Sequence, residues 1–317
     1  GSTAPQPSPE PEPGERESIE RMENQATVCL ESATVQALMQ DILQRLDVPP
    51  DESAVVAGVL LEASLSGYDS HGIMRIPTYV HEIRQKTMVP GASVECIRET
   101  VSSAHLDAHK GLGPVAATEA VRLATQKAEQ TGVGCISIVN ANDIARLGSY
   151  LHKPAEAGLV ALIMVNDAGG GPCTVPWGGV DPFLSTNPLA AGIPWRKETP
   201  VIIDISTSVT SGGRLKMLAH REEPVPEGVL IDGEGNPGLD LNAFFTDPKK
   251  SALLPLGGQV AGHKGFALSL LVDILAGALS GTGCSTGEEN GMYRNGVFVL
   301  VIDPEKFVSR ATFREIV

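Results

Sequence analysis

The sequence predicts a mixed α/β fold, and three observations support this prediction. Two short apolar runs, residues 133–139 and 159–165, have the length and composition of buried strands. Residues 115–129 place alanine and valine at helical spacing before the first run, and a second helix is expected at 150–157 between the two. Polar residues follow each run directly, where open α/β sheets place their ligands. We therefore expect the functional site at the ends of these strands.

The composition narrows the class of protein. The chain has 317 residues and 42% hydrophobic content, enough for one large or two ordinary domains with a buried core. Its formal net charge is −14 and no cluster of Lys and Arg offsets that charge locally, so we expect no nucleic-acid partner. The five cysteines form no Cys-x-x-Cys pair, which indicates reduced thiols in a cytoplasm and neither disulfides nor a metal site.

No membrane segment is expected. The apolar run 268–279 contains Asp273 and is too short to cross a bilayer. No N-terminal stretch combines a basic region with an apolar one, so the sequence shows no secretory signal. Residues 1–25 repeat proline with acidic residues between and cannot bury enough apolar surface to fold. We predict a disordered tail there, with a docking peptide for a partner as the alternative.

Two helices are expected before the first strand. Residues 30–46 carry apolar side chains at helical spacing, with Ser32 as a candidate cap, and residues 51–65 repeat the pattern. The other expected elements are strands at 93–99, 102–107, 189–194, 201–205 and 297–303, helices at 266–279 and from 307 to 317, and a surface excursion at 224–239.

A polar run behind the second helix, residues 66–79, combines groups that suit a small acid. His71, Arg75 and Tyr79 follow one another at intervals of four, so in a continuous helix they share one face. Arginine fits a carboxylate bidentately, and an imidazole beside it can move a proton to or from an oxygen on the adjacent carbon. A glycine and a proline within the run argue for a break or a fresh start. The alternative is an ordinary surface helix start with Ser70 as its cap.

The pair Gly111-Leu-Gly113 does not indicate a Rossmann fold. A dinucleotide loop of that kind needs a third glycine at a fixed offset, and none follows here. We therefore expect a turn between a strand and the helix at 115–129.

Four stretches resemble landmarks of the malate/L-lactate dehydrogenase family, which is separate from the Rossmann-type lactate and malate dehydrogenases. They stand in the family's order and together cover roughly residues 30–310. The resemblance implies a mixed α/β fold of the L-sulfolactate dehydrogenase-like, non-Rossmann dinucleotide-binding type. The stretches are His71-Gly-x-x-Arg75-x-Pro77, residues 185–194, residues 204–208, and residues 262–268 with 273–277.

The resemblance also implies a domain organisation and a set of ligands. A dinucleotide-binding domain is expected at 110–250. A second domain combines a helical, substrate-side segment at 26–109 with a return segment at 251–317, which is short at its C-terminal end compared with relatives. The implied cofactor is NAD or NADP, the implied substrate is a small carboxylate-bearing molecule, and the implied assembly is a homodimer with its active site near the subunit contact.

The polar run gains roles from the resemblance. Arg75 holds the substrate carboxylate, while His71 polarises or protonates the substrate heteroatom. Ser70 and Tyr79 orient the substrate, and Arg146 is expected among the substrate-binding residues.

One position departs from the family pattern. Relatives carry an Asn-Ser-x-His-x-Gly motif whose histidine exchanges a proton with the substrate oxygen, and this chain has Asp143 there and Ala145 in place of the following glycine. An ordinary aspartate has a pKa near 3.9, so it is a poor acid and a weak base at neutral pH. Asp143 either occupies the catalytic position or pairs with Arg75, Arg146 or a cationic substrate. The alternative is a cap on the helix that follows.

The expected cofactor site gathers residues from several strand ends. Asn166 and Asp167 end a strand, and the three glycines after them either admit a phosphate or fill a loop. Lys264, with Gly265, is expected at the start of a helix, where free amides and the helix dipole favour phosphate. The remaining expected cofactor contacts are Asp204, Ser206 and Arg214; the hydroxyl-rich loop that contains Ser206 is alternatively an ordinary helix cap.

Two functions are consistent with these residues. The first is an NAD(P)-dependent oxidoreductase of a small 2-hydroxy acid, 2-oxo acid or cyclic imino acid. An imine suits Asp143 better than a ketone, since an iminium already carries its proton. The second is a redox-inactive family member that uses the pocket for a non-redox reaction or for ligand binding, an interpretation favoured by Asp143, the loop after Asp167 and the short C-terminal segment.

Overall fold

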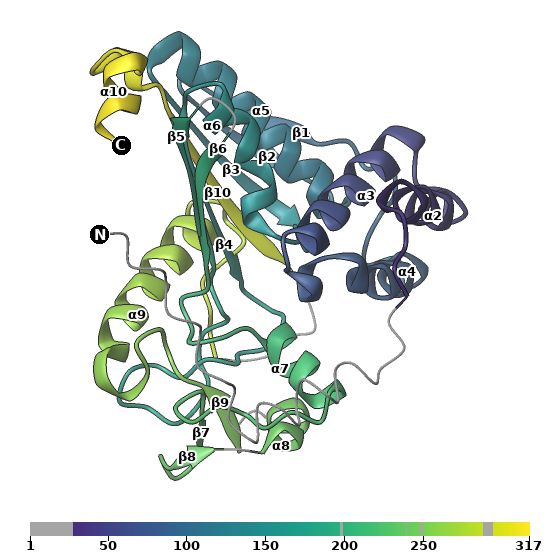
Figure 1. Ribbon diagram of the computed structural model, residues 1–317, viewed down its shortest axis with the longest axis vertical. Coiled ribbons are helices and arrows are strands. Elements are labelled where there is room, and N and C mark those ends of the chain that lie inside the picture. The colour runs from purple at the N-terminus through teal and green to yellow at the C-terminus, as the bar shows by residue number, and fades with distance from the viewer. Residues whose placement is uncertain (1–27, 197–198, 239, 248–249, 288–293) are drawn as a thin grey trace, which may run out of the picture.

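The computed structural model describes residues 28–317 except 197–198, 239, 248–249 and 288–293, so the predicted tail at 1–25 lies outside the described residues. It confirms the mixed α/β class with a seven-stranded sheet. In Figure 1 this sheet forms the upper body of the molecule, with a smaller part below it. The strands, in spatial order, are β1 (Glu95–Glu99), β2 (Ser103–Asp107), β3 (Val133–Ala141), β10 (Asn295–Ile302), β4 (Val160–Asp167), β5 (Leu189–Arg196) and β6 (Thr199–Ile205).

The strand at the centre of the sheet is β10, which is the last in the chain. It pairs antiparallel with both β3 and β4, and Val299 lies opposite Ile136 on one side and Ile163 on the other. Only β2 and β3 are parallel; the other neighbouring pairs are antiparallel. The sheet therefore draws strands from all three of the predicted sequence segments.

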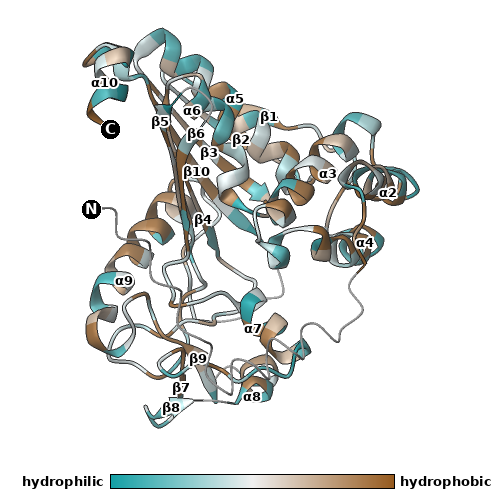
Figure 2. Ribbon diagram, viewed as in Figure 1, coloured by the Kyte–Doolittle hydropathy of each residue, from teal (hydrophilic) through white to brown (hydrophobic). Residues whose placement is uncertain are grey.

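Alternation along the strands divides the core into two layers. In β10, Val297, Val299 and Val301 point into the larger core, while Phe298 and Leu300 point to the opposite face. A strand covered on both faces is apolar at consecutive positions, because successive side chains point to opposite faces. Figure 2 shows the resulting brown, apolar colouring along much of the sheet.

Each face of the sheet has its own helix. The alanine-rich face of α5 (Gly113–Thr131) packs against β3 and β10, and α5 begins at Gly113, the last residue of the predicted turn. The small alanines allow close approach, and Gly134 allows the closest, since a Cβ there would lie 1.9 Å from the Ala124 carbonyl oxygen. The opposite face is covered by α9 (Gly258–Val272) and the π-helical turn η4 (Asp273–Ala278).

The two N-terminal helices are confirmed, as α2 (Ser32–Gln44) and α3 (Pro50–Leu65). The predicted cap Ser32 is wrong: Glu31 is the N-cap residue and makes no side-chain capping bond. The helices pack with α4 (Ile76–Arg84) around the fully buried Leu43. This helical cluster lies beside the sheet in Figure 1.

The predicted surface excursion at 224–239 belongs to a small folded region that the sequence did not reveal. Three very short strands, β7 (Leu230–Asp232), β8 (Pro237–Gly238) and β9 (Ser251–Leu253), form a second sheet. The helices α7 (Gly212–His220) and α8 (Leu241–Thr246) pack with it around a separate apolar cluster. In Figure 1 these elements form the lower part of the molecule.

The predicted helix at 266–279 begins earlier than expected, at Gly258, after Gly257 in the left-handed region. Through η4 it reaches Ala278, a stretch whose length and composition alone would suit a membrane span. Its inner face instead packs on β4 and β10 and carries the buried Asp273, as in a helix of a protein core.

Two glycines inside α9 serve close packing. A Cβ on Gly262 would lie 2.7 Å from the ring of Trp177, and one on Gly265 would lie 2.2 Å from the Leu256 carbonyl oxygen. The glycine-rich signal at 262–265 therefore comes from the interior of a helix and its contacts, whereas a helix start was expected.

Gly265→Ala is expected to destabilise the protein by about 1–3 kcal/mol, because the new methyl group forces the backbone at Leu256 to move. Urea unfolding measures the change in the free energy of unfolding. Gly58→Ala in α3 is the matched control: nothing lies within 4 Å of the position that its Cβ would take, so the same substitution should stabilise by about 1 kcal/mol. Equal effects of the two substitutions would contradict the packing role of Gly265.

Candidate active site

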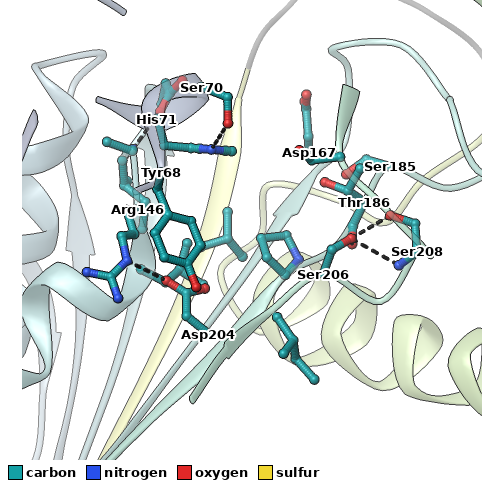
Figure 3. Close-up of a pocket in the computed structure, with 18 of the residues that line it drawn as sticks. Tyr68, Ser70, His71, Arg146, Asp167, Ser185, Thr186, Asp204, Ser206 and Ser208 are labelled. Atoms are coloured by element: carbon teal, nitrogen blue, oxygen red, sulfur yellow. Dashed lines mark hydrogen bonds and ion pairs between the residues drawn. The ribbon is translucent and has the colours of Figure 1, made fainter. Parts of the chain in front are cut away.

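A cavity of about 490 Å³ lies where the ends of β4 and β6, the start of β10 and the loop after β3 meet the turn η1 (Asp69–His71). Figure 3 shows its labelled side chains in two groups. One group carries the acid, base and cation, and the other is dominated by hydroxyl groups. The first group is Tyr68, Ser70, His71, Arg146 and Asp204; the second is Asp167, Ser185, Thr186, Ser206 and Ser208.

His71 is held by its neighbour. Its Nδ1 lies 2.9 Å from Ser70 Oγ, which fixes the plane of the ring. Burial and the charge of Arg75 lower the pKa of His71 to about 4, against an opposing effect of Asp204. The imidazole is therefore neutral at physiological pH, so it can accept a proton from a hydroxyl group in the cavity.

This shifted pKa has a consequence for stability. The unfolded chain binds a proton at His71 near pH 6.5, whereas the folded chain does so only near pH 4. Between these values the unfolded state holds more protons, so lowering the pH favours unfolding. We expect His71 to cost up to about 3 kcal/mol of stability between pH 6.5 and 4, measured by urea unfolding across this range. The His71→Gln variant should lose correspondingly less stability between pH 6.5 and 4. If the stability of the wild type and of the variant depends on pH in the same way, the shifted pKa of His71 is contradicted.

Arg146 is a buried cation with fixed partners. Its Nη1 donates to Glu62 Oε1 at 2.7 Å and its Nε lies 3.4 Å from Asp204 Oδ2. The guanidinium also lies over the ring of Tyr68, 4.4 Å from the centroid. Arg146 is 7% exposed, so these contacts fix it at the cavity wall.

Asp204 is the last residue but one of β6 and contacts both Arg146 and the Gly148 amide. It accepts a 2.8 Å hydrogen bond from the Gly148 amide, and burial raises its pKa more than that bond and Arg146 lower it. Gly148 is a tight position, because a Cβ there would lie 3.0 Å from both Arg146 Nη2 and Asp204 Oδ2. The predicted Asp204 is thus brought to the acid-base group of the cavity.

The structure divides the predicted polar run at residues 66–79. Gly72 separates η1 from a second turn, η2 (Ile73–Arg75), so the continuous helix that would align His71, Arg75 and Tyr79 does not form. His71 and Ser70 line the cavity, but Arg75 and Tyr79 do not. Tyr79 is fully buried among the N-terminal helices, where its hydroxyl donates to the Asp143 carbonyl oxygen at 3.1 Å.

Asp143 forms an ion pair with Arg75, one of the three partners the sequence allowed. Its other oxygen accepts from the Ala145 amide at 2.5 Å, two residues along, which closes a local turn. The alternative that Asp143 caps the next helix is wrong, because η3 (Leu147–Tyr150) begins after Arg146 and no side chain caps it. Ala145 has a φ of 60°, which explains why a glycine suits this position.

The hydroxyl-lined group surrounds one carboxylate. Asp167 Oδ1 accepts from the amides of Gly169 and Gly170, at 3.2 and 2.8 Å. A Cβ on Gly170 would lie 1.9 Å from Asp167 Oδ2, so the glycine loop wraps around this side chain. Burial raises the pKa of Asp167 against the effect of these bonds. These two amides therefore bind the protein's own carboxylate, and the loop does not present them to a phosphate.

A buried network of hydrogen bonds around Asp273 fixes the side chain of Asn166. Its Nδ2 donates to Asp273 Oδ1 at 3.1 Å, and the same oxygen accepts from Asn187 and from the hydroxyl of Ser285. Asp273 is 3% exposed, and its carboxylate has a structural role as the shared acceptor of this network. The network fixes the floor of the cavity where Asn166 lines it.

Three predicted cofactor contacts lie outside the cavity lining. Lys264 is the seventh residue of α9 and is exposed, so its amide is not at a helix start. Gly265 packs against Leu256 as described. Arg214 is exposed within α7, whose cap is Ser211: its Oγ accepts from the Arg214 amide at 3.2 Å. The cap alternative for the hydroxyl-rich loop is thus confirmed at Ser211, while Ser206 does line the cavity.

Two site residues were missed by the sequence interpretation. Glu62 on α3 binds Arg146 and the hydroxyl of Ser149, and its pKa is lowered because these bonds and that of Ser66 outweigh burial. Asn142 anchors the loop after β3 through its Nδ2, which donates to the Lys110 carbonyl oxygen at 2.7 Å. A single acidic residue on an apolar helix gives no sequence signal of this role. Asn142, in contrast, lies inside the polar cluster that follows the first apolar run.

Comparison with known proteins gives consistent matches over most of the chain. The family model described as malate/L-lactate dehydrogenase matches residues 30–317. The L-sulfolactate dehydrogenase of Methanothermobacter thermautotrophicus is 36% identical, over 87% of this chain and 79% of that protein. The malate dehydrogenase of Pyrococcus horikoshii is also 36% identical, over 86% of this chain and 76% of its own length.

Solved structures agree with the sequence matches. The malate dehydrogenase of Entamoeba histolytica superposes with a TM-score of 0.86 at 28% identity, covering 91% of this chain and 82% of that one. The Δ1-piperideine-2-carboxylate reductase of Pseudomonas syringae superposes with a TM-score of 0.79 at 30% identity, covering 92% and 87%.

Proposed function

The chain belongs to the malate/L-lactate dehydrogenase family, and on that premise we propose that it is an NAD(P)-dependent oxidoreductase acting on a small 2-hydroxy acid, 2-oxo acid or cyclic imino acid. The observation that carries the proposal is the cavity that places neutral His71, bonded to Ser70, beside Asp204 and opposite a hydroxyl-lined wall. The comparisons offer no support for the redox-inactive alternative.

The hydroxyl-lined wall suits a nicotinamide nucleoside. Ser185, Thr186, Ser206 and Ser208 provide donors and acceptors, and Asp167 provides a carboxylate, which is the type of group that binds ribose hydroxyls. Asn166, whose side chain donates a hydrogen bond to Asp273, lines the same part of the cavity. When bound, nicotinamide would supply or accept a hydride. These residues would hold it on the side of the cavity away from Ser70.

The other wall would perform the proton transfer. In the oxidation of a 2-hydroxy acid, His71 accepts the hydroxyl proton at the nitrogen that does not face Ser70. The imidazolium that forms is stabilised by Asp204, whose charge already opposes the lowering of the His71 pKa. Arg146 keeps Asp204 in place through its contact at 3.4 Å.

Titration with NADH and NADPH, followed by nicotinamide fluorescence, tests the proposal. Saturable binding of at least one nucleotide below millimolar concentration is expected, and oxidation of that nucleotide should follow addition of an acceptor acid. If neither NADH nor NADPH binds at millimolar concentration, the proposal is wrong. Ser206→Ala with Ser208→Ala should weaken nucleotide binding, since both residues line the cavity.

A homodimer is the assembly we propose. On the edge strand β6, Val201, Ile203 and Ile205 are 36%, 42% and 38% exposed. A row of apolar side chains on an edge strand is a surface that a second copy would cover. Sedimentation equilibrium tests this assembly, and a single monomeric species at micromolar concentration would contradict it. We also propose a cytoplasmic location, which the free thiols of the described cysteines support.

A further inference from the structure

We propose that Glu62 is a positioning residue for the proton transfer in the cavity. It holds the Arg146 guanidinium at a distance from Asp204, and the charge of Asp204 thereby remains available to the imidazolium that His71 forms. Glu62 does not belong to the described lining of the cavity, so it acts through Arg146. The inference rests on the proposed function and adds a residue to its machinery.

Both carboxylate oxygens of Glu62 have fixed partners. Oε1 accepts from Arg146 Nη1 at 2.7 Å and from Ser66 Oγ at 2.8 Å, and Oε2 accepts from the Ser149 hydroxyl. Ser66 Oγ also accepts from Arg146 Nη1, at 3.1 Å, so Glu62, Ser66 and Arg146 form a closed ring of hydrogen bonds. The carboxylate therefore has one orientation, and its charge-assisted bond fixes one end of the guanidinium.

The other end of the guanidinium stays apart from Asp204. Arg146 Nε lies 3.4 Å from Asp204 Oδ2 and has no hydrogen-bond partner among the described residues. Asp204 instead accepts from the Gly148 amide at 2.8 Å. Figure 3 shows Arg146 and Asp204 in contact at the same side of the cavity as His71. Two carboxylates thus compete for one guanidinium, and Glu62 makes the closer contact.

This division of the Arg146 charge matters for His71, whose imidazole becomes cationic when it takes the substrate proton. Burial and Arg75 lower the pKa of His71, and Asp204 opposes them, so the charge of Asp204 favours the imidazolium. A carboxylate in a short pair with arginine offers less of its field to a third group, since the guanidinium field opposes it. By taking the closer contact with Arg146, Glu62 keeps His71 a stronger base.

Oxidation assays on Glu62→Gln test the inference. Glutamine keeps the shape of the side chain and removes its charge, so Arg146 should close on Asp204. With L-malate, L-lactate or L-pipecolate as the probe and saturating NAD or NADP, kcat should fall by about 10- to 100-fold. KM for the probe should change by less than about 3-fold, because Glu62 lies outside the described lining. The solvent deuterium isotope effect on kcat should rise, because proton transfer becomes slower.

Glu62→Asp separates the charge of the side chain from its shape. Aspartate keeps the charge on a shorter side chain, so this variant should retain more of kcat than Glu62→Gln. A residue needed for packing alone would give the opposite order, because glutamine has nearly the size of glutamate. If Glu62→Asp is no more active than Glu62→Gln, the inference is wrong.

Glu99→Gln is the matched control. Glu99 binds Lys127 at 2.8 Å, and the Lys127 side chain is 8% exposed, as that of Arg146 is, but neither residue of this pair lines the cavity. The variant should keep kcat and the isotope effect of the wild type. Circular dichroism shows whether each variant is folded, and failure of both Glu62 variants to fold would make Glu62 a structural residue and overturn the inference.

Two further outcomes separate the inference from the proposed function. An unchanged kcat in Glu62→Gln, or a lower kcat with an unchanged isotope effect, would overturn the inference while the proposed function stands. No reduction of NAD or NADP by the wild type with any of the three probes would overturn both.

Discussion

Replacing His71 with glutamine is expected to lower kcat for the interconversion of a 2-hydroxy acid and its 2-oxo acid by about 10²- to 10⁴-fold, the usual contribution of a positioned acid or base. Glutamine keeps the hydrogen bond with Ser70 within reach but cannot exchange a proton. The binding of NADH or NADPH should change little, because His71 lies on the wall away from the hydroxyl groups. Steady-state kinetics and fluorescence titration measure the two effects.

The pattern across substrates sharpens this test. Reduction of an iminium needs no proton in the hydride step, so its rate should fall by only about 10-fold in His71→Gln. His105→Gln is the matched control, because His105 Nδ1 lies 2.9 Å from Ser137 Oγ on the sheet, outside the cavity lining. If His105→Gln and His71→Gln lower the rate alike, His71 is not the proton-transfer group.

Arg146→Met is expected to destabilise the protein by about 3–5 kcal/mol, because it leaves the carboxylates of Glu62 and Asp204 without their buried cation. Methionine keeps much of the apolar stem, so the loss reports the charge. The melting temperature should fall by on the order of 10 °C, measured by calorimetry or circular dichroism.

Two further variants isolate the network. Arg146→Met combined with Glu62→Gln removes one of the uncompensated charges and should recover part of the loss. Arg45→Met, from a pair with side chains 75% and 57% exposed, should cost less than about 1 kcal/mol. A loss of the same size in Arg45→Met and Arg146→Met would contradict a special role for the buried pair.

The strands and helices could be predicted where one periodicity dominates. The runs that became β3 and β4 are apolar on both faces, and α5 presents alanine at helical spacing, so local pattern and final fold agree. The start of α9 was misjudged because Gly257 precedes it and Gly258 and Gly262 lie among its first five residues, and glycines so placed suggest a loop. Gly257 and Gly258 have positive φ, and Gly262 lies against the ring of Trp177, a distant contact that a local pattern cannot show.

The site could be predicted in its composition but not in its pairing. Ser70, His71, Asp143 and Asp204 were all named from the sequence, and the structure brings them to one cavity. The sequence left three partners open for Asp143, because the choice depends on how the turn at Gly72 directs Arg75.

The position of β10 has a consequence for synthesis of the chain on the ribosome. Its partners β3 and β4 are complete by residue 167, yet the strand that joins them begins only at Asn295. Until then both strands present unpaired edges, which are templates for pairing with other chains, and they are apolar on both faces. A nascent chain that stops short of residue 295 therefore cannot close its sheet and is expected to need a chaperone. Emergence of eight more residues supplies both missing ladders at once.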